Sequence, residues 1–247
     1  MCTQNLELLR KLNPNTPIHG LYGGAGGVEA LPPDFRERFD SLFALPFEDP
    51  QYNWQHGDIC IRWWFKEVGH SFDFSHLAVV EWDLVYLKPL DEIFHAFTEE
   101  ANYVALSGNY QKMYDEGWGW IQGRFAGAIE ALLVDIGKER SIDIKTLSFG
   151  IFGGCVLCRK YLEELSCRIL RSLSNDEVRL SLYSALFDVP LIDNGFLSDK
   201  RNQMNAENIE YGEKELIETL ERGGNTIHPI RVVIPDLLKT VACCDAV

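Results

Sequence analysis

The sequence lacks two features that would each point to a class of partner. No run of about 20 uninterrupted apolar residues is present, the length that a helix needs to cross a bilayer. Basic residues are few: 23 Lys and Arg stand against 37 Asp and Glu, giving a formal net charge of −14. This balance argues against nucleic acid or an anionic membrane surface as the main partner, because both are bound largely through Lys and Arg.

Cysteine pairs that would indicate a disulfide scaffold or a zinc site are also missing. The seven cysteines are odd in number and irregularly spaced. Cys155 and Cys158 have CxxC spacing, but no second CxxC or HxxxH pair completes a zinc site. Arg159 would favour a redox role by lowering the pKa of Cys158, whereas a buried strand needs only two small apolar side chains. We favour the strand and reduced thiols.

The opening residues, "MCTQNLELLRKL", have no apolar core of signal-peptide length and predict an amphipathic helix. Together with reduced thiols, this predicts a cytoplasmic protein without a transmembrane segment.

The 247 residues, 46% of them hydrophobic, are enough to bury a large core. Apolar runs alternate with helix-period segments, which predicts an α/β fold in a single domain over residues 1–247. Strands or extended segments are predicted at 18–24, 77–83, 102–108, 149–160, 189–193 and 225–235. Helices are predicted at 6–12, 33–44, 56–69, 89–101, 126–140, 161–172, 174–188 and 212–224, and a long loop at 108–123.

Two carboxylates interrupt the apolar run "HLAVVEWDLVYLKPL" at residues 76–90. On an extended chain Glu81 and Asp83 point to one side and Trp82 to the other. Ligands of open α/β sheets bind beyond the carboxyl ends of strands, and two hard oxygen ligands suit Mg²⁺ or Mn²⁺. The alternative is a pair of solvated loop residues, or carboxylates paired with Lys88 or an arginine.

This block resembles the GT-A-fold nucleotide-sugar glycosyltransferases. In that family a DxD motif follows an apolar strand and holds a divalent cation on the donor diphosphate. Here Glu-Trp-Asp stands in place of DxD, between the glycine-ended helix "WWFKEVG" and the proline-led helix "KPLDEIF". The resemblance covers roughly residues 5–235, with specific residues only in this central block. It implies a GT-A-like (Rossmann-like) α/β fold with a mixed, mostly parallel central sheet flanked by helices.

The resemblance also implies roles for residues outside the block. His228 would complete the metal site with Asp83 and Glu81. Asp176 or Glu177, at the start of a helix, would act as general base on the acceptor hydroxyl. The donor would contact Tyr22, Gly23, Asp58, Arg62, Trp82, Gly153, Gly154 and Arg231.

Several of these residues also have a purely structural interpretation, which the sequence leaves open. The alternatives are a strand-edge histidine (His228), the partner of a surface carboxylate (Arg231), a β-bulge (Gly153, Gly154), helix capping (Asp176, Glu177) and an i,i+4 helical ion pair (Asp58, Arg62).

Taken with the resemblance, these residues imply a metal-dependent glycosyltransferase of the hexosyltransferase class. It would move a sugar, with inversion, from a nucleotide-diphosphate sugar, first of all a UDP-sugar, to a hydroxyl of a glycan or small-molecule acceptor. Two alternatives stay open: a GT-A-like binding or scaffold protein without catalysis, and a metal-assisted phosphoester hydrolase that uses the same carboxylates.

Overall fold

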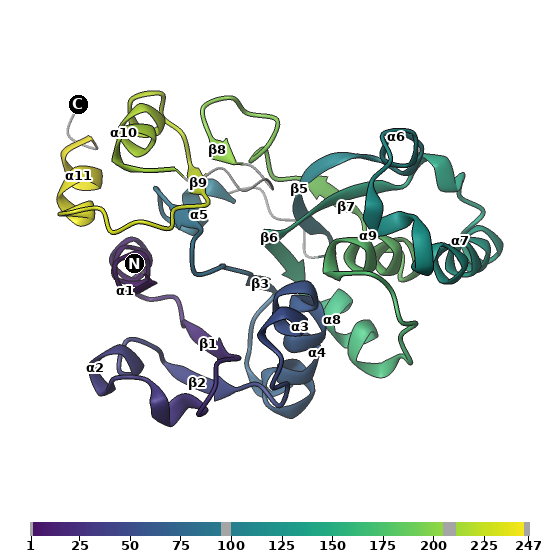
Figure 1. Ribbon diagram of the computed structural model, residues 1–247, viewed down its shortest axis with the longest axis horizontal. Helices are drawn as coiled ribbons and strands as arrows, with labels where there is room; N and C mark the ends of the chain where they lie inside the picture. The colour runs from purple at the N-terminus through teal and green to yellow at the C-terminus, as the bar shows by residue number, and fades with distance from the viewer. Residues whose placement is uncertain (1, 95–99, 205–210, 245–247) are drawn as a thin grey trace. The chain divides into compact units, whose positions relative to one another are not determined.

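The computed structural model describes residues 2–94, 100–204 and 211–244, and its elements form a mixed α/β fold (Figure 1). The chain forms two compact units, each made of separate segments: Met1–Ala44, Val80–Phe97 and Gly195–Val247 in the first, Leu45–Val79 and Thr98–Asn194 in the second. Because the chain passes from one unit to the other after residues 44, 79, 97 and 194, neither is a continuous domain. The single domain over residues 1–247 stays a prediction.

The first unit contains two small sheets. Strands β1 and β2 pair in parallel, and β9 is the central strand of a second sheet, antiparallel to β4 and parallel to β8. Its helices and strands are α1 (Cys2–Leu12), β1 (His19–Tyr22), α2 (Pro33–Arg36), β2 (Ser41–Ala44), β4 (Val85–Tyr86), α5 (Leu90–Ile93), β8 (Gln203–Met204), α10 (Glu213–Glu221), β9 (Thr226–His228) and α11 (Leu237–Cys244).

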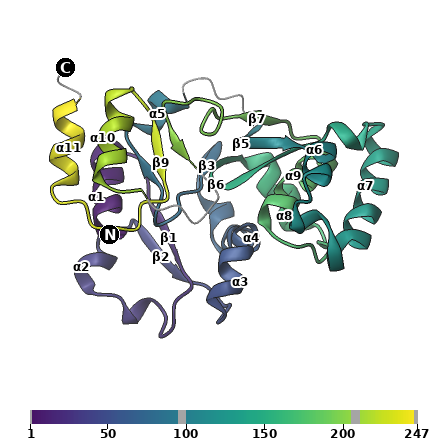
Figure 2. The ribbon, with the colours of Figure 1, turned by 45° about the horizontal axis from the view of Figure 1, so that its top comes forward.

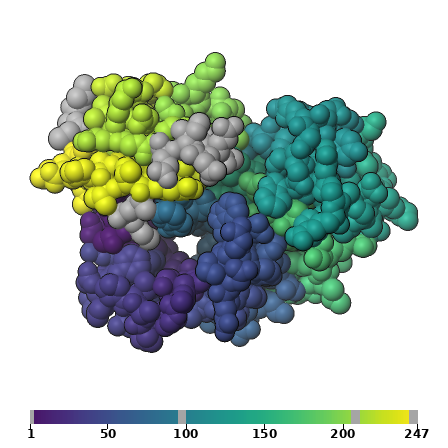
Figure 3. Space-filling model, viewed as in Figure 1, coloured from purple at the N-terminus to yellow at the C-terminus, as the bar shows by residue number. Residues whose placement is uncertain are grey.

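The core of the first unit lies between the β9 sheet and helices α1, α10 and α11. Its buried residues are Leu8, Val85, Leu87, Leu216, Ile227, Ile230, Ile234, Leu237 and Val241. Figures 1 and 2 show the three helices grouped beside β9, and Figure 3 shows the yellow C-terminal segment against the purple N-terminal helix. Positions 5, 8 and 12 of α1 share one helix face by their i, i+3, i+7 spacing, so this face meets the core.

Residues 33–44, predicted as one helix, contain only the single turn of α2 before the chain turns into β2. Asp40 exchanges two bonds with Ile18: its backbone N–H donates to the Ile18 carbonyl at 2.9 Å, and its carboxylate accepts from the Ile18 N–H at 2.7 Å. The Ser41 hydroxyl lies 2.6 Å from Nδ1 of His19. Pairing with β1 therefore outweighs the local helical periodicity.

The second unit contains one four-stranded sheet in the order β3-β6-β5-β7. Its first two pairs are antiparallel and the pair β5–β7 is parallel. The elements are α3 (Pro50–Gln55), α4 (Gly57–Glu67), β3 (His76–Ala78), β5 (Asn102–Asn109), α6 (Tyr110–Asp115), α7 (Ala126–Arg140), β6 (Ser148–Cys158), α8 (Arg159–Cys167), α9 (Asp176–Leu186) and β7 (Leu191–Asp193). Over the described residues the structure thus has small sheets of mixed direction where the sequence predicts a mostly parallel central sheet.

Most other predicted elements are confirmed. Helices α1, α4, α7, α8, α9 and α10 and strands β1, β5, β6, β7 and β9 fall within or across the predicted segments. Of the helix predicted at 89–101, the described residues contain only the single turn of α5, which ends at Ile93; residues 95–99 lie outside the described part. The loop predicted at 108–123 includes α6 and a 3-10 turn at Gly119–Ile121. Among the described helices, none is both long and apolar enough to cross a membrane.

Cys155 and Cys158 are buried free thiols in β6, as the strand interpretation predicts. Burial raises the pKa of the Cys158 thiol. Because the thiolate is the reactive form of cysteine, this position favours a packing role over redox chemistry.

A buried ion pair joins α4 to α9. Arg179 donates from Nε and Nη2 to the two carboxylate oxygens of Asp58, at 2.6 and 2.7 Å. Asp58 is fully buried and the Arg179 side chain is 3% exposed. Arg179 also donates to the Leu173 carbonyl at 3.1 Å, and its Nη2 lies 2.7 Å from Nδ1 of His56. This fork fixes the start of α4 against α9.

We expect Arg179→Met to lower the free energy of unfolding by about 3–5 kcal/mol, because the Asp58 charge would stay buried without its partner. The matched control is Arg171→Met. It removes an ion pair with Asp135 whose side chains are 45% and 40% exposed, and such pairs contribute about 0–1 kcal/mol. Urea unfolding followed by far-UV circular dichroism measures both variants, and equal small losses would contradict the assignment.

Candidate metal site

Strand pairing in the β9 sheet brings two distant parts of the chain together. β4 runs antiparallel to β9, with Val85 opposite Ile227. The residues before β4 therefore lie beside the residues that end β9. The backbone N–H of Ile230 donates to the carbonyl of Asp83 at 2.9 Å, which extends the pairing past both strands. Asp83 and His228 are neighbours for this reason.

Glu81 and Asp83 lie in a tight turn, not on an extended strand. β3 ends at Ala78, and the N–H of Leu84 donates to the carbonyl of Glu81 at 3.1 Å. The prediction of a strand over 77–83 is therefore wrong in its second half. The carboxylates do come together, but a hydrogen-bonded turn brings them there instead of the alternation of side chains along a strand.

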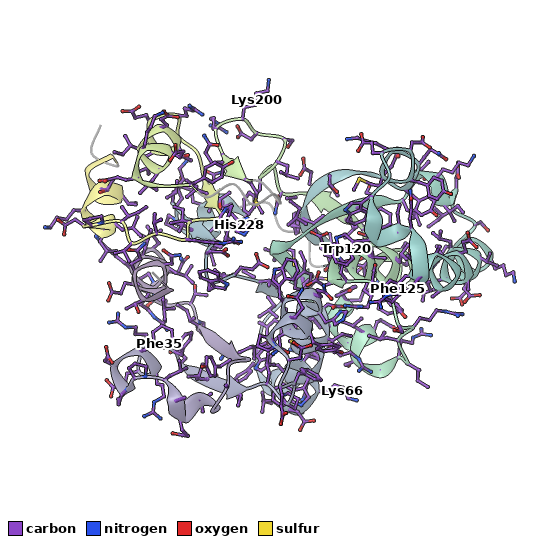
Figure 4. The ribbon with its side chains drawn as sticks, in the orientation of Figure 1. Phe35, Lys66, Trp120, Phe125, Lys200 and His228 are labelled. Carbon is purple, nitrogen blue, oxygen red and sulfur yellow. The ribbon has the colours of Figure 1, made fainter. Side chains whose placement is uncertain are left out.

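The two carboxylates and His228 form a group that can hold a metal ion. Nε2 of His228 lies 3.2 Å from Oε2 of Glu81 and 3.5 Å from Oδ1 of Asp83. One ligand atom from each residue lies within 4.8 Å of the other two. Adjacent ligands of an octahedral ion, each at about 2.0–2.1 Å from it, are about 3 Å apart. Asp83 is 3% and His228 9% exposed, and Figure 4 shows the position of His228, the last residue of β9.

The imidazole of His228 and the carboxylate of Asp83 shift each other's pKa. Burial opposes a charge on His228, but hydrogen bonds and charge from Asp83 and Glu81 outweigh it and raise the pKa of His228 to about 9. Burial also opposes the Asp83 charge, yet His228 and Arg231 outweigh it and lower the pKa of Asp83. At neutral pH an imidazolium therefore lies between two carboxylates, and a cation must displace its proton.

Arg231 and Trp82 border the group. Nε of Arg231 donates to Oδ2 of Asp83 at 2.9 Å, while the other oxygen, Oδ1, faces His228. The guanidinium carbon lies 6.0 Å from the centre of the Trp82 ring, whose residue is 50% exposed. The structure thus brings together five predicted residues: Glu81, Trp82, Asp83, His228 and Arg231. Arg231 does pair with a carboxylate, but with the buried Asp83 and not with the surface carboxylate of the alternative interpretation.

Asp176 and Glu177 belong to the second unit, at the start of α9. The helix is capped by Asn175, whose Oδ1 accepts from the N–H of Val178 at 3.1 Å. The Asp176 carboxylate accepts from the N–H of Gly57 at 3.0 Å and from that of Glu177 at 2.9 Å. Asp176 therefore ties α9 to α4, and a general-base role for either acid stays a prediction.

Asp58 and Arg62, predicted to contact the donor or each other, each bind a different partner. Both carboxylate oxygens of Asp58 accept from Arg179. Arg62 donates from Nε to the Leu165 carbonyl and from Nη2 to the Arg168 carbonyl, both at 2.8 Å, and so satisfies carbonyls at the end of α8. The i,i+4 ion pair is therefore wrong, and the donor contacts stay predictions.

Gly153 and Gly154 lie inside β6, where its pairing with β5 shifts register. Gly154 has a φ of 75°, in the left-handed region that favours glycine. The strand pairing is therefore irregular at these glycines, and a β-bulge there stays a prediction. In the first unit, Tyr22 ends β1 and its side chain lies so close to Gly24 that a Cβ there would collide with it. Donor contacts by Tyr22, Gly23, Gly153 and Gly154 stay predictions.

Two residues of α1 contact the segments that carry or follow the candidate metal ligands and were not predicted from the sequence. Nδ2 of Asn5 donates to the carbonyl of Trp82 at 2.9 Å. Gln4 accepts from the N–H of Ile234 at 3.0 Å and donates to the Val232 carbonyl at 3.2 Å. The one sequence signal is that Asn5 falls on the apolar face of an amphipathic helix.

No family model matches the chain, and no curated protein matches it. Any assignment of function therefore depends on the residues of the site and their geometry.

A divalent cation is expected to release about one proton per protein at pH 7.5, because the pKa of His228 is about 9 in the metal-free group. Below pH 9 the apparent affinity should rise about tenfold per pH unit, and proton release should vanish above it. Adding Mn²⁺ to weakly buffered, EDTA-treated protein with a pH-sensitive dye measures the release. His228→Gln should release none, whereas the exposed His70→Gln should match the unmodified protein; full release from His228→Gln would contradict the assignment.

The same ionisation stabilises the metal-free protein. Because the pKa of His228 in the folded state lies above the usual 6.5, its contribution to the free energy of unfolding is complete below about pH 6.5. This contribution is lost as the pH rises through about 9.

Proposed function

We propose that the protein is a metal-dependent, GT-A-like glycosyltransferase with Mn²⁺ or Mg²⁺ held by Glu81, Asp83 and His228. Its donor is a nucleotide-diphosphate sugar, first of all a UDP-sugar, and its acceptor is a hydroxyl of a glycan or small molecule. The observation that carries the proposal is the Glu81, Asp83 and His228 group. It forms around the Glu-Trp-Asp sequence, where the resemblance requires a cation.

The charge of the group supports an anionic ligand. With neutral His228, the two carboxylates and Arg231 together carry one negative charge. A divalent cation converts this to one positive charge, which favours binding of a phosphate. Mg²⁺ is commonly held by one or two carboxylates together with substrate phosphates, and when bound it supplies neutralisation of the charge on a leaving nucleoside diphosphate.

The neighbouring residues suit the rest of such a ligand. Arg231 adds a guanidinium, which hydrogen-bonds well to phosphate oxygens, beside the Asp83 carboxylate. Trp82 exposes half of its surface next to Arg231 and offers an aromatic face to a sugar or base. An inverting transfer also requires a base for the acceptor hydroxyl, and the resemblance gives that role to Asp176 or Glu177.

The test is thermal unfolding with UDP-, GDP- and dTDP-sugars, each with and without Mn²⁺. A ligand that binds only the folded state at about 100 times its Kd adds about 2.7 kcal/mol. We expect a rise in Tm that requires metal and nucleotide sugar together. Asp83→Asn should abolish it, whereas Asp91→Asn, which changes an exposed carboxylate of α5, should keep it.

Turnover separates the transferase from a hydrolase with the same site. A transferase should release the nucleoside diphosphate faster when a hydroxyl acceptor is added and should form a glycosylated product. Rapid cleavage of phosphoesters that no acceptor accelerates would contradict the proposal, as would the absence of any Tm shift across the panel.

A further inference from the structure

The peptide between the two carboxylate ligands is held by a side chain from α1. Nδ2 of Asn5 donates to the carbonyl of Trp82 at 2.9 Å, and Asn5 is 8% exposed. A hydrogen bond that is shielded from water resists exchange with solvent. It therefore fixes the orientation of the Trp82–Asp83 peptide, which lies between the Cα atoms of Trp82 and Asp83 in the turn that carries both carboxylates.

The adjacent residue, Gln4, binds the segment that follows Arg231. Its amide oxygen accepts from the N–H of Ile234 at 3.0 Å, and its amide nitrogen donates to the Val232 carbonyl at 3.2 Å. One side-chain amide thus binds both a carbonyl and an N–H of this segment. Consecutive residues of α1 therefore bind both segments that carry the metal group.

The core sets the position of α1 independently of the metal group. Leu8, which is 1% exposed, packs with Val85 of β4 and Ile227 of β9. α1 contacts β4 and α11. Because Asn5 lies one turn before Leu8 on the same face of the helix, the packing of Leu8 places the Asn5 amide beside the Trp82 carbonyl. The helix is a fixed reference for the turn at residues 81–84.

Asn5 is a poor residue for this position on grounds of stability alone. Its face of α1 is apolar, and its buried Oδ1 has no hydrogen-bond partner among the described residues. A buried amide that is only half satisfied costs about 1–3 kcal/mol in desolvation. A leucine would bury apolar surface there without that cost. Local rules of this kind are most often broken where a residue serves a site.

We propose that Asn5, assisted by Gln4, is a positioning residue that holds the Glu81–Asp83 turn against His228, so that all three ligand atoms can reach one ion. The inference rests on the metal site of the proposed function and is independent of sugar transfer. Outer-shell bonds that orient ligands typically contribute 10–100-fold in metal affinity.

The experiment measures the Kd of Mn²⁺ for the full chain by electron paramagnetic resonance, in which free Mn²⁺ gives the signal. Asn5→Leu is the main variant, because it fills the apolar face and keeps the fold while removing the donor to Trp82. Asn5→Ala is the second. Both should weaken Mn²⁺ binding about 10–100-fold and alter the spectrum of bound Mn²⁺, and Gln4→Ala should have a smaller effect.

Asn13→Ala is the matched control. Asn13 follows α1 and is 6% exposed. It accepts from the N–H of Leu90 at 2.8 Å and donates to the Leu9 carbonyl at 2.9 Å. It therefore also binds the end of α1 to the segment that holds Leu90, and its side-chain hydrogen bonds within the described residues involve neither Trp82 nor the residues after His228. We expect it to lower Tm at least as much as Asn5→Ala and to leave the Mn²⁺ affinity unchanged.

An unchanged Mn²⁺ affinity in Asn5→Leu would overturn the inference, and so would equal weakening in Asn5→Ala and Asn13→Ala. Asn5-dependent Mn²⁺ binding without any effect of nucleotide sugars would support the inference and overturn only the proposed function. A protein that binds no Mn²⁺ would overturn both.

Discussion

Two carboxylates placed next to each other and partly out of water repel, and the first unit is arranged so that this repulsion is offset. Asp83 is 3% exposed, and its two oxygens face different partners: Arg231 holds Oδ2, and His228 faces Oδ1. Glu81 faces the same imidazole nitrogen. Arg231 therefore supplies one permanent positive charge against the two negative charges of Glu81 and Asp83. The second positive charge must come from a proton on His228 or from a metal ion.

A small sheet is sufficient to build this arrangement, because the strands only have to bring two ends together. β4 has two residues and β9 three, yet their antiparallel pairing places the turn that precedes β4 beside the residues that end β9. Backbone hydrogen bonds hold the two strands together. The α1 side chains Asn5 and Gln4 add hydrogen bonds to the segments at Trp82 and Ile234, respectively. A metal site needs its ligands held by such supporting contacts, since errors of about 1 Å already loosen it.

The sequence reveals the chemistry of the site better than its geometry. The Glu-Trp-Asp motif identifies the right carboxylates, and the family resemblance adds His228. Local periodicity also predicts the long helices α4, α7 and α9, because a helix face repeats within a few residues. What periodicity cannot give is the partner of a residue far along the chain. The turn at 81–84, the strand formed by residues 41–44 and the bond from Asn5 to Trp82 all depend on such partners, as does the choice of Arg179 over Arg62 by Asp58.

Two buried charge groups among the described residues differ in a way that bears on function. In the second unit, Arg179 covers both oxygens of Asp58 with a fork that stays charged at any pH the protein meets, so the pair is closed to other ligands. In the first unit the cation between the two carboxylates is His228, whose proton can leave near neutral pH when a metal ion binds. Arginine in the position of His228 would balance the two carboxylates more permanently, because its charge does not titrate, and it would exclude a metal ion. Because His228 can lose its proton, it balances the charges of Glu81 and Asp83 less permanently, but it allows a metal ion to replace that proton. This difference makes the Asp58–Arg179 pair a fixed part of the fold and leaves the Glu81, Asp83 and His228 group able to hold a metal ion.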